Sequence, residues 1–365
     1  MKRTTIRRAA LPGIAAFALA LTGCAAGNEG GGSGGDSSLS GTLAGGGSSA
    51  QEAAQNAWIA GFQTANPDVT ITYDPVGSGG GREGFISGGF DFAGSDAYLT
   101  DDEGELTKAN ERCGSDTIEV PDYVSPIAVI FNVDGVDSLQ LSPATLAGIF
   151  AGQITTWDDP AIAADNPDAS LPSADINAVH RSDESGTTKN YTDYLSAVAG
   201  DVWTVGAVET WPTEYGGEGA KGTSGVVAAV TDGQNSIGYA DASQAGDLGT
   251  AAIGVGSEFV APSAEAAAKI LSVSPAVDGA ADVQMIFDLD HNTTESGTYP
   301  IVLTSYLMAC QTYDDQATAD LVKGYLEYIL SDEGQQTGAD EAGAAPLADD
   351  LKSQAEDIVA KISAK

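Results

Sequence analysis

Hydrophobic and polar positions along this chain follow two periods. Apolar residues at every second position, or in short unbroken runs, are typical of strands, and apolar residues three and four apart are typical of helices. Residues 69–74 show the first pattern, and residues 49–65 show the second. The two patterns alternate along the chain. The predicted strands are 39–44, 69–74, 91–94, 123–133, 176–179, 236–239 and 301–310, and the predicted helices are 49–65, 82–87, 142–151, 185–198, 316–330 and 348–362.

This alternation predicts an α/β protein with mainly parallel, twisted sheets. In such sheets ligands bind beyond the carboxyl ends of the strands. The part of the chain that carries the two patterns is about 325 residues long, which is enough for two domains. No internal repeat is present.

The first residues are typical of an export signal. Four basic residues precede an apolar stretch over 9–21, which is shorter than the roughly 20 apolar residues needed to span a bilayer. The stretch ends at Leu21-Thr22-Gly23-Cys24, which resembles a bacterial lipobox. We expect residues 1–23 to be a signal peptide and Cys24 to carry a lipid. An ordinary signal peptide with a chance cysteine is the alternative, and the export route, general or twin-arginine, stays open.

Residues 24–38 are almost entirely Gly, Ser, Ala, Asn and acidic residues, apart from the cysteine. Such a segment cannot bury a core and is predicted to be a flexible linker. Its root-mean-square reach is about 20 Å, at roughly 5–6 Å × √n. A domain on this linker would stay close to the membrane that holds the lipid.

The charge of the chain limits its partners. It carries 15 basic and 52 acidic residues, a net charge of −37, and removal of residues 1–23 with their four basic residues makes it −41. Nucleic acids and anionic lipid surfaces are therefore poor partners. Contact with a membrane is expected only through the lipid.

Two cysteines, Cys113 and Cys310, remain after the one in the lipobox. A pair in an oxidising compartment can form a disulfide, and the sequence leaves this open. The only histidines are His180 and His291, and no CxxC is present. A zinc site is therefore not expected, and no metal or other cofactor is predicted.

Three predicted strands run into Gly/Ser turns that open helices, at residues 45–49, 77–81 and 181–187. Each turn offers close backbone approach, free N–H groups at a helix start and a hydroxyl, which together suit an anion. Ser and Thr are also common helix caps, so three capped helices are the plain alternative. The arginine that begins the third turn favours the anion.

Other motifs carry less weight. Residues 79–84 fit G-x-G-x-x-G, but a lone match is weak evidence for a dinucleotide site. Residues 288–292 begin like a calcium loop, yet Thr293 stands where the sharp turn needs glycine. Phosphatases with metal clusters and Ser–His–Asp hydrolases both need placed histidines, which two residues 111 positions apart do not supply. We therefore expect no enzyme activity.

Six blocks in the same order resemble one family. The chain is similar, from about residue 39 to 334, to the phosphate-binding component (PstS type) of the bacterial high-affinity phosphate ABC transporter. The blocks that carry the resemblance are Gly45-Gly46-Gly47-Ser48-Ser49, Gly77-Ser78-Gly79-Gly80, Asp91-Phe92-Ala93-Gly94-Ser95-Asp96, Trp157-Asp158-Asp159-Pro160-Ala161-Ile162, Arg181 to Thr187, and Ile237-Gly238-Tyr239.

The resemblance implies a two-domain periplasmic-binding-protein-like (class II) fold. Residues 39–125 and 300–365 would form one domain and residues 126–299 the other, with two chain crossings at the hinge and the ligand in the cleft between the domains. It implies a monomer that is anchored by lipid to the outer face of the cell membrane. Inorganic phosphate would be delivered to integral-membrane permease subunits.

The site residues that the resemblance implies are carried over position by position. The family usually has Thr-Phe where this chain has Ser49-Ala50, and often Gly where it has Glu184. We expect the hydroxyl and N–H roles to survive the first change, and Glu184 to weaken binding modestly unless its side chain points to solvent. The implied phosphate ligands are Ser49, Ala50, Ser78, Asp96, Arg181, Ser185, Gly186 and Thr187, with Asp183 orienting Arg181.

Asp96 would select phosphate. At neutral pH phosphate keeps a proton that a carboxylate can accept, whereas sulfate has none, and a site built to pair a substrate O–H can reject an analogue that lacks it by about 10⁴–10⁵-fold. A loop acid that caps the following turn is the plain alternative for Asp96. For the whole protein, the alternatives are binding of another oxyanion, a phosphate-sensing lipoprotein and, less favoured, an extracellular phosphatase.

Overall fold

The computed structural model describes residues 39–271 and 273–365, which belong to one compact unit. The predicted signal peptide (1–23) and the predicted linker (24–38), with the Cys24 that is predicted to carry a lipid, lie outside the described residues. Within the described part, no helix has both the length and the apolar character needed to cross a membrane.

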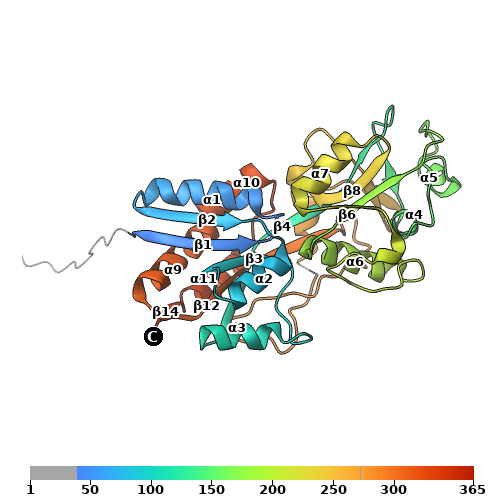
Figure 1. Cartoon of the computed structure of the whole chain (residues 1–365). Helices are drawn as coiled ribbons and strands as arrows, with labels where there is room; N and C mark the ends of the chain where they lie inside the picture. The colour runs from blue at the N-terminus through green and yellow to red at the C-terminus, as the bar shows by residue number, and fades with distance from the viewer. Residues whose placement is uncertain (1–38, 272) are drawn as a thin grey trace, which may run out of the picture. The chain divides into compact units, whose positions relative to one another are not determined.

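Strands and helices alternate along this unit (Figure 1). The strands are β1 (Gly41–Gly47), β2 (Val69–Asp74), β3 (Phe92–Ser95), β4 (Thr117–Asn132), β5 (Gln140–Leu141), β6 (Asn177–Arg181), β7 (Glu218–Ala220), β8 (Ser236–Asp241), β9 (Gly249–Thr250), β10 (Ala252–Val255), β11 (Glu258–Val260), β12 (Val302–Cys310), β13 (Thr312–Tyr313) and β14 (Ser363–Ala364). The helices are α1 (Glu52–Ala65), α2 (Ser78–Ile86), α3 (Glu105–Cys113), α4 (Pro143–Phe150), α5 (Pro160–Asp165), α6 (Gly186–Ala199), α7 (Gly222–Asp232), α8 (Ala264–Ala268), α9 (Gln316–Leu330), α10 (Asp332–Ala342) and α11 (Asp349–Val359), with short 3₁₀ turns at Thr213–Tyr215 and Ala242–Gln244.

The main sheet has the strand order β2-β1-β3-β12-β4-β8-β6-β7, and β9 also pairs with β4. At one end β1 pairs in parallel with β2 and β3, and at the other end β6 pairs in parallel with β8 and β7. The middle strands β12 and β4 run antiparallel to their neighbours. The predicted α/β fold class is confirmed. The antiparallel centre was not predicted, because hydrophobic periodicity does not encode strand direction.

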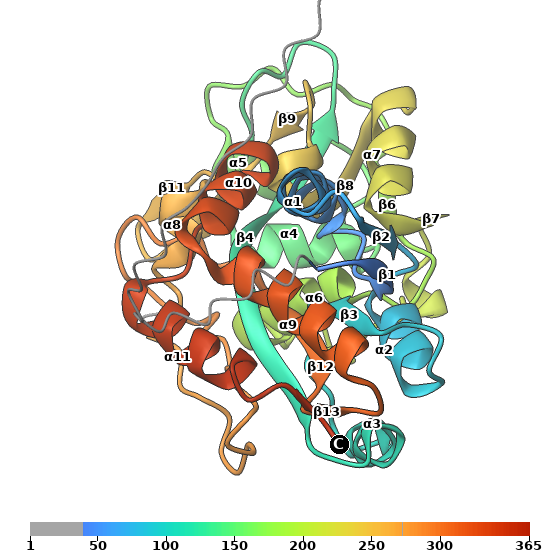
Figure 2. The ribbon, with the colours of Figure 1, turned by 90° about the vertical axis from the view of Figure 1, so that its left-hand side faces the viewer.

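Strand β4 connects the two halves of the sheet (Figures 1 and 2). It pairs with β12 up to Pro126 and with β8 from Ile127 onward. The predicted strand 123–133 covers only part of it. The missed first half contains Glu119 and Asp122, polar residues that interrupt the apolar run in the sequence but are fully buried in the fold.

The glycines of the second Gly-rich segment lie in a helix and not in a turn. Helix α2 begins at Ser78, whereas the sequence predicted a helix over 82–87. A Cβ on Gly81 would lie 2.4 Å from the Cα of Gly47, so this helix touches the backbone at the end of β1. Close packing therefore outweighs the low helix propensity of glycine. Helices α3, α7 and α10 were also missed, because their sequences carry short or weak apolar stripes.

A disulfide joins the end of α3 to the end of β12. The sulfurs of Cys113 and Cys310 are bonded, with their Cα atoms 5.3 Å apart and a sequence separation of 197 residues. Both side chains are buried. The bond closes a long loop in the unfolded chain, which is where a disulfide has most of its stabilising effect.

Loss of this disulfide should lower the free energy of unfolding by about 2–5 kcal/mol, because the unfolded chain regains the entropy of the long loop. Urea unfolding of the wild type with and without reductant, followed by circular dichroism, measures the effect. The variant with both Cys113→Ala and Cys310→Ala is the matched control, since reductant should leave it unchanged. An unfolding midpoint that reduction does not shift in the wild type would contradict the expectation.

Candidate functional site

Asp96 directly follows β3, and 3% of its side chain surface is exposed. Four hydroxyl groups from different segments donate to its carboxylate. Ser48, Thr187 and Ser78 donate to Oδ2 at 2.6, 3.3 and 3.5 Å. Ser305 of β12 donates to Oδ1 at 3.0 Å. A single buried carboxylate is therefore the centre on which the ends of β1, β3, α2, α6 and β12 converge.

The first Gly/Ser turn divides its groups between two neighbours. Ser48 binds Asp96, and its Oγ also accepts the N–H of Ala50 at 3.1 Å. Ser49 instead contacts the start of α7. Its Oγ is 3.0 Å from Thr223 Oγ1 and accepts the Thr223 N–H at 3.0 Å. The backbone N–H predicted as a ligand at residue 50 is thus paired within its own turn.

Arg181 is the last residue of β6 and is buried. Its guanidinium donates to Asp183 through Nε–Oδ1 at 2.7 Å and Nη2–Oδ2 at 2.6 Å. Asp183 also accepts the N–H of Gly222 at 3.0 Å. Two side chains of the third turn therefore form a planar, charge-assisted pair that holds the guanidinium in one orientation.

Helix α6 begins against Asp96. The Ser185 hydroxyl accepts the Thr188 N–H at 3.1 Å and so caps the helix. A Cβ on Gly186 would lie 2.6 Å from Ser78 Oγ and 2.8 Å from Asp96 Cβ. Only glycine lets the helix start approach this closely, and the approach brings the Thr187 hydroxyl within reach of the carboxylate.

The electrostatics of the cluster are balanced by specific contacts. Burial raises the pKa of Asp96, while the hydroxyl donors and the charge of Arg181 act in the opposite direction. Burial alone would also raise the pKa of Asp183. The hydrogen bonds from Arg181 and the charge of Arg181 outweigh this effect and lower the pKa of Asp183 below its usual value. The two carboxylates therefore differ, because only Asp183 is paired directly with a cation.

Most of the predicted site residues meet in this cluster. Ser78, Asp96, Gly186 and Thr187 are in contact with one another, and Arg181 with Asp183 acts on Asp96 by its charge. Ser49 contacts Thr223 and not Asp96. The Ala50 N–H donates to Ser48, and the Ser185 hydroxyl accepts from Thr188, so both bonds stay within a few residues of the chain.

Sequence reasoning missed four polar residues of the cluster. Ser48 stood inside a recognised block, and Thr223 stands in Gly222-Thr223-Ser224-Gly225, a fourth segment of similar composition, which forms the first residues of α7. The hydroxyl of Tyr239 accepts the Arg181 N–H at 3.2 Å and contacts Thr188. Ser305 gives no signal in the sequence, since it lies in an apolar strand.

Arg82 lies beside the cluster and is surrounded by acids. Its guanidinium binds Glu209 at 2.7 Å and Glu105 at 2.9 Å, and it lies 3.7 Å from Glu184. About half of the Glu184 side chain is exposed, and its carboxyl carbon occupies the space that a Cβ on Gly79 would need. Burial and then the charge of Glu209 raise the pKa of Glu184. The charge of Arg82 acts in the opposite direction and thus partly offsets the negative charge of Glu184.

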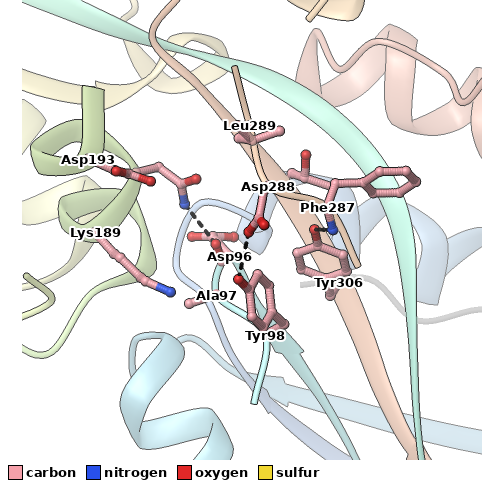
Figure 3. Close-up of a pocket in the computed structure, with 11 residues that line it drawn as sticks. Asp96, Ala97, Tyr98, Lys189, Asp193, Phe287, Asp288, Leu289 and Tyr306 are labelled. Atoms are coloured by element: carbon pink, nitrogen blue, oxygen red, sulfur yellow. Dashed lines mark hydrogen bonds between the residues drawn. The ribbon is translucent and has the colours of Figure 1, made fainter. Parts of the chain in front are cut away.

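A cavity of 310 Å³ lies beside Asp96 (Figure 3). From α6, Lys189 and Asp193 face Tyr98 and Asp288, and the Lys189 ammonium lies 4.9 Å from the centre of the Tyr98 ring. Of the predicted anion ligands only Asp96 lines it. The cavity therefore adjoins the hydroxyl cluster and does not coincide with it.

Neither histidine side chain has a hydrogen bond to Asp96 among the described residues, although His180 Nδ1 lies 2.8 Å from the carbonyl oxygen of Arg181. His180 stacks on Trp211 with ring centres 4.7 Å apart, and burial lowers its pKa. His291 is buried, with its Nδ1 2.8 Å from the carbonyl oxygen of Pro300. Over residues 39–271 and 273–365, no group of three or more His, Cys, Asp or Glu side chains could hold a metal ion.

Known proteins resemble this chain over most of its length. A family model described as a PBP superfamily domain matches residues 32–333. Phosphate-binding protein PstS 3 of Mycobacterium leprae (strain TN) is 36% identical over 312 residues, which cover 84% of this chain and 83% of that protein. Phosphate-binding protein PstS2 of Mycobacterium bovis (strain BCG / Pasteur 1173P2) is 34% identical over 350 residues, covering 93% and 94%.

Solved structures show the same fold. A high affinity periplasmic phosphate-binding protein, solved with bound phosphate, has a TM-score of 0.67 at 22% identity and covers 86% of this chain and 92% of its own. A phosphate-binding protein from Stenotrophomonas maltophilia has a TM-score of 0.66 at 19% identity, covering 87% and 93%. Together with the sequence relatives, these matches establish that the chain belongs to the PBP superfamily and, within it, to the PstS family of phosphate-binding proteins.

Proposed function

We propose that this protein binds inorganic phosphate, as hydrogen phosphate or dihydrogen phosphate, and delivers it to the permease subunits of an ABC transporter. The observation that carries the proposal is the buried Asp96 carboxylate, encircled by hydroxyl donors with Arg181 behind them. The PstS relatives named above support the same ligand.

Asp96 would accept a hydrogen bond from the O–H group of the bound phosphate. Its Oδ2 already accepts from Ser48, Ser78 and Thr187, and a phosphate O–H is a donor of the same kind. When phosphate enters, the hydroxyls turn from Asp96 to the phosphate oxygens, and the phosphate O–H takes their place on Oδ2. A fully deprotonated oxyanion cannot make this exchange, because its oxygens would face the carboxylate with no proton between them.

The remaining contacts would neutralise the charge of the anion. Arg181 is fixed by Asp183 and supplies the cation. Ser49, Ala50, Ser185 and Gly186 would contribute hydroxyl or N–H groups after the local bonds described above are exchanged. The starts of α1 and α2 have no side-chain cap, which leaves N–H groups free to point to an anion.

We further propose that residues 39–125 and 300–365 form one domain, that residues 126–299 form the other, and that the two close over the ligand. The change of pairing partner on β4 between Pro126 and Ile127 supports a boundary there. The contacts of Ser49 with Thr223 and of Asp96 with Thr187 would then connect the two domains. Ligand capture and domain closure would use the same side chains.

For the cellular setting we propose an exported monomer that is held to the outer face of the cell membrane by a lipid on Cys24. Support comes from the signal-like residues 1–23 and the lipobox-like sequence at their end. The matched relatives are named as binding proteins, which supports a binding role and not a catalytic one. A phosphate-sensing lipoprotein would share the site and differ only in its partner.

Calorimetric titration with phosphate and then sulfate tests the proposal. The wild type should bind one phosphate and give no heat with sulfate. The Asp96→Asn variant should lose at least about a hundredfold of this discrimination, because an amide can donate to a sulfate oxygen. Asp288→Asn, which alters an acid in the adjoining cavity, is the matched control and should keep the discrimination. Comparable binding of sulfate by the wild type would favour another oxyanion as the ligand.

Replacement of Arg181 by lysine should weaken phosphate binding by about 10–100-fold. Lysine keeps the charge but loses the planar, bidentate contact with Asp183 and therefore the fixed position of the cation. Arg112→Lys, on the disulfide-linked α3, should leave the dissociation constant unchanged. Equal affinities for Arg181→Lys and the wild type would show that phosphate binding does not depend on the bidentate contact that fixes the guanidinium of Arg181.

Phosphate affinity should change little with ionic strength. The chain carries a net charge of −37, so long-range attraction cannot gather an anion, and binding must depend on short contacts in a buried site that salt screens poorly. Titrations between 20 and 500 mM sodium chloride should give dissociation constants within about threefold of one another. A steep loss of affinity with salt would show that unshielded surface charge drives binding.

A further inference from the structure

A chain of buried hydrogen bonds leads from the helical layer of the protein to Asp96. The Tyr325 hydroxyl of α9 donates to Gln55 Oε1 at 2.8 Å, and Gln55 Nε2 donates to Gln51 Oε1 at 2.9 Å. Gln51 Nε2 donates to Ser305 Oγ at 2.5 Å, and Ser305 donates to Asp96 Oδ1 at 3.0 Å. All five side chains are buried. We call Tyr325, Gln55, Gln51 and Ser305 the donor relay.

The direction of the donor relay is fixed by one backbone carbonyl. Gln51 Nε2 also lies 3.2 Å from the carbonyl oxygen of Tyr306, which can only accept. The amide nitrogen of Gln51 must therefore face β12, and its oxygen must face Gln55. The same reasoning then orients Gln55, whose nitrogen is used on Gln51 and whose oxygen is left to accept from Tyr325.

The Ser305 hydroxyl has one proton, and its two acidic neighbours are Asp96, whose Oδ1 lies 3.0 Å away, and Asp122, whose pKa the same hydroxyl lowers against the effect of burial. Since Ser305 Oγ accepts from Gln51 Nε2, its own proton is available to Asp96 Oδ1. Every bond in the relay thus points its hydrogen toward the carboxylate. Aligned hydrogen bonds polarise one another, so the last bond is stronger than an isolated one.

We propose, on the basis of the phosphate-binding function proposed above, that the donor relay makes Gln51 and Ser305 positioning residues for specificity: they hold Asp96 in its ionised, accepting form and assign Oδ2 to the ligand. The hydroxyls on Oδ2 must leave when phosphate binds, whereas the donor on Oδ1 does not have to move. The two oxygens of Asp96 therefore have separate roles, one structural and one for the ligand.

The surroundings of Asp96 explain why such a donor is needed. Burial raises the pKa of Asp96, and Arg181, the cation that acts on it, is bound to Asp183. Burial and the charge of Asp96 raise the pKa of Asp122 well above its usual value, and burial raises that of Asp241 to about 6. The other titratable groups that interact with Asp96 are Tyr73 of β2 and Tyr123 of β4, whose pKa values are raised well above the ordinary one by burial.

The fold makes room for the donor relay at one glycine. A Cβ on Gly94 of β3 would lie 2.2 Å from Gln51 Oε1, so the amide packs directly on the strand that leads to Asp96. The register of β12 and β4 shifts between Ser305 and Tyr306. This irregularity lies where the Ser305 side chain and the Tyr306 carbonyl oxygen both contact Gln51 Nε2.

The test compares Ser305→Ala and Gln51→Leu with Thr304→Val. Each of the first two removes one bond of the donor relay, and the third removes a buried hydroxyl from the same strand that makes no hydrogen bond to Asp96. Proteins expressed from the full-length gene are labelled at the aspartate carboxyl carbon, and the Asp96 signal is assigned by its loss in Asp96→Asn. The titration of Asp96 is then followed by NMR without ligand.

We expect the pKa of Asp96 to be higher in Ser305→Ala and in Gln51→Leu than in the wild type and in Thr304→Val. Calorimetry between pH 5.5 and 8 should show that the preference for phosphate over sulfate falls by about tenfold in both variants, and more at low pH, because a protonated Asp96 donates to sulfate. Thermal unfolding reports whether each variant is folded. If either Ser305→Ala or Gln51→Leu does not fold, the folded variant alone tests the proposal.

An Asp96 titration that is the same in the folded variants and in the control would overturn the proposal. So would an unchanged preference for phosphate at every pH. A wild type that binds no phosphate would instead refute the proposed function, while the ligand-free NMR titration would still report on the donor relay. The two failures are therefore distinguishable.

Discussion

The structure depends on surrounding one buried carboxylate, Asp96, with hydrogen-bond donors. Removing an unpaired carboxylate from water costs several kcal/mol, so Asp96 must be surrounded by donors that come from the whole fold. Four hydroxyls from the ends of β1, α2, α6 and from β12 meet at this side chain. These groups can come so close only because residue 186 is a glycine. A Cβ at this position would overlap both Ser78 and Asp96. The glycines of the cluster thus follow from the needs of a buried charge.

The two central strands tie this charge to the architecture. Strand β4 pairs with β12 in its first half and with β8 in its second, so it belongs to both ends of the sheet. Ser305 of β12 donates to Asp96. Asp122 of β4 is a second buried acid, and the charge of Asp96 contributes to raising its pKa. The strands that connect the two halves therefore also sense the protonation of the site.

The net charge of the chain opposes the approach of an anion, so the affinity of the site must come from short-range contacts. A net charge of −37 keeps the protein soluble and repels other acidic surfaces, but it cannot attract an anion. Arg181 forms an ion pair with Asp183, and Arg82, beside the cluster, forms ion pairs with three glutamates. Short, oriented hydrogen bonds must then supply most of the affinity, since they act inside the Debye length, where repulsion by distant charges has faded.

The sequence by itself determined the alternation of strands and helices and the three Gly/Ser segments, because these features are local patterns of composition. The roles of Asp96 and Arg181 were implied by the resemblance to a known family. The sequence did not determine the antiparallel centre of the sheet, the helical conformation of Gly79–Gly81, or the division of Ser48 and Ser49 between two partners. Nor did it show the donor relay, whose Gln51 and Ser305 are 254 positions apart. Only the tertiary structure decided these features, since pairing direction, glycine contacts and buried hydrogen bonds depend on which distant segments the fold brings together.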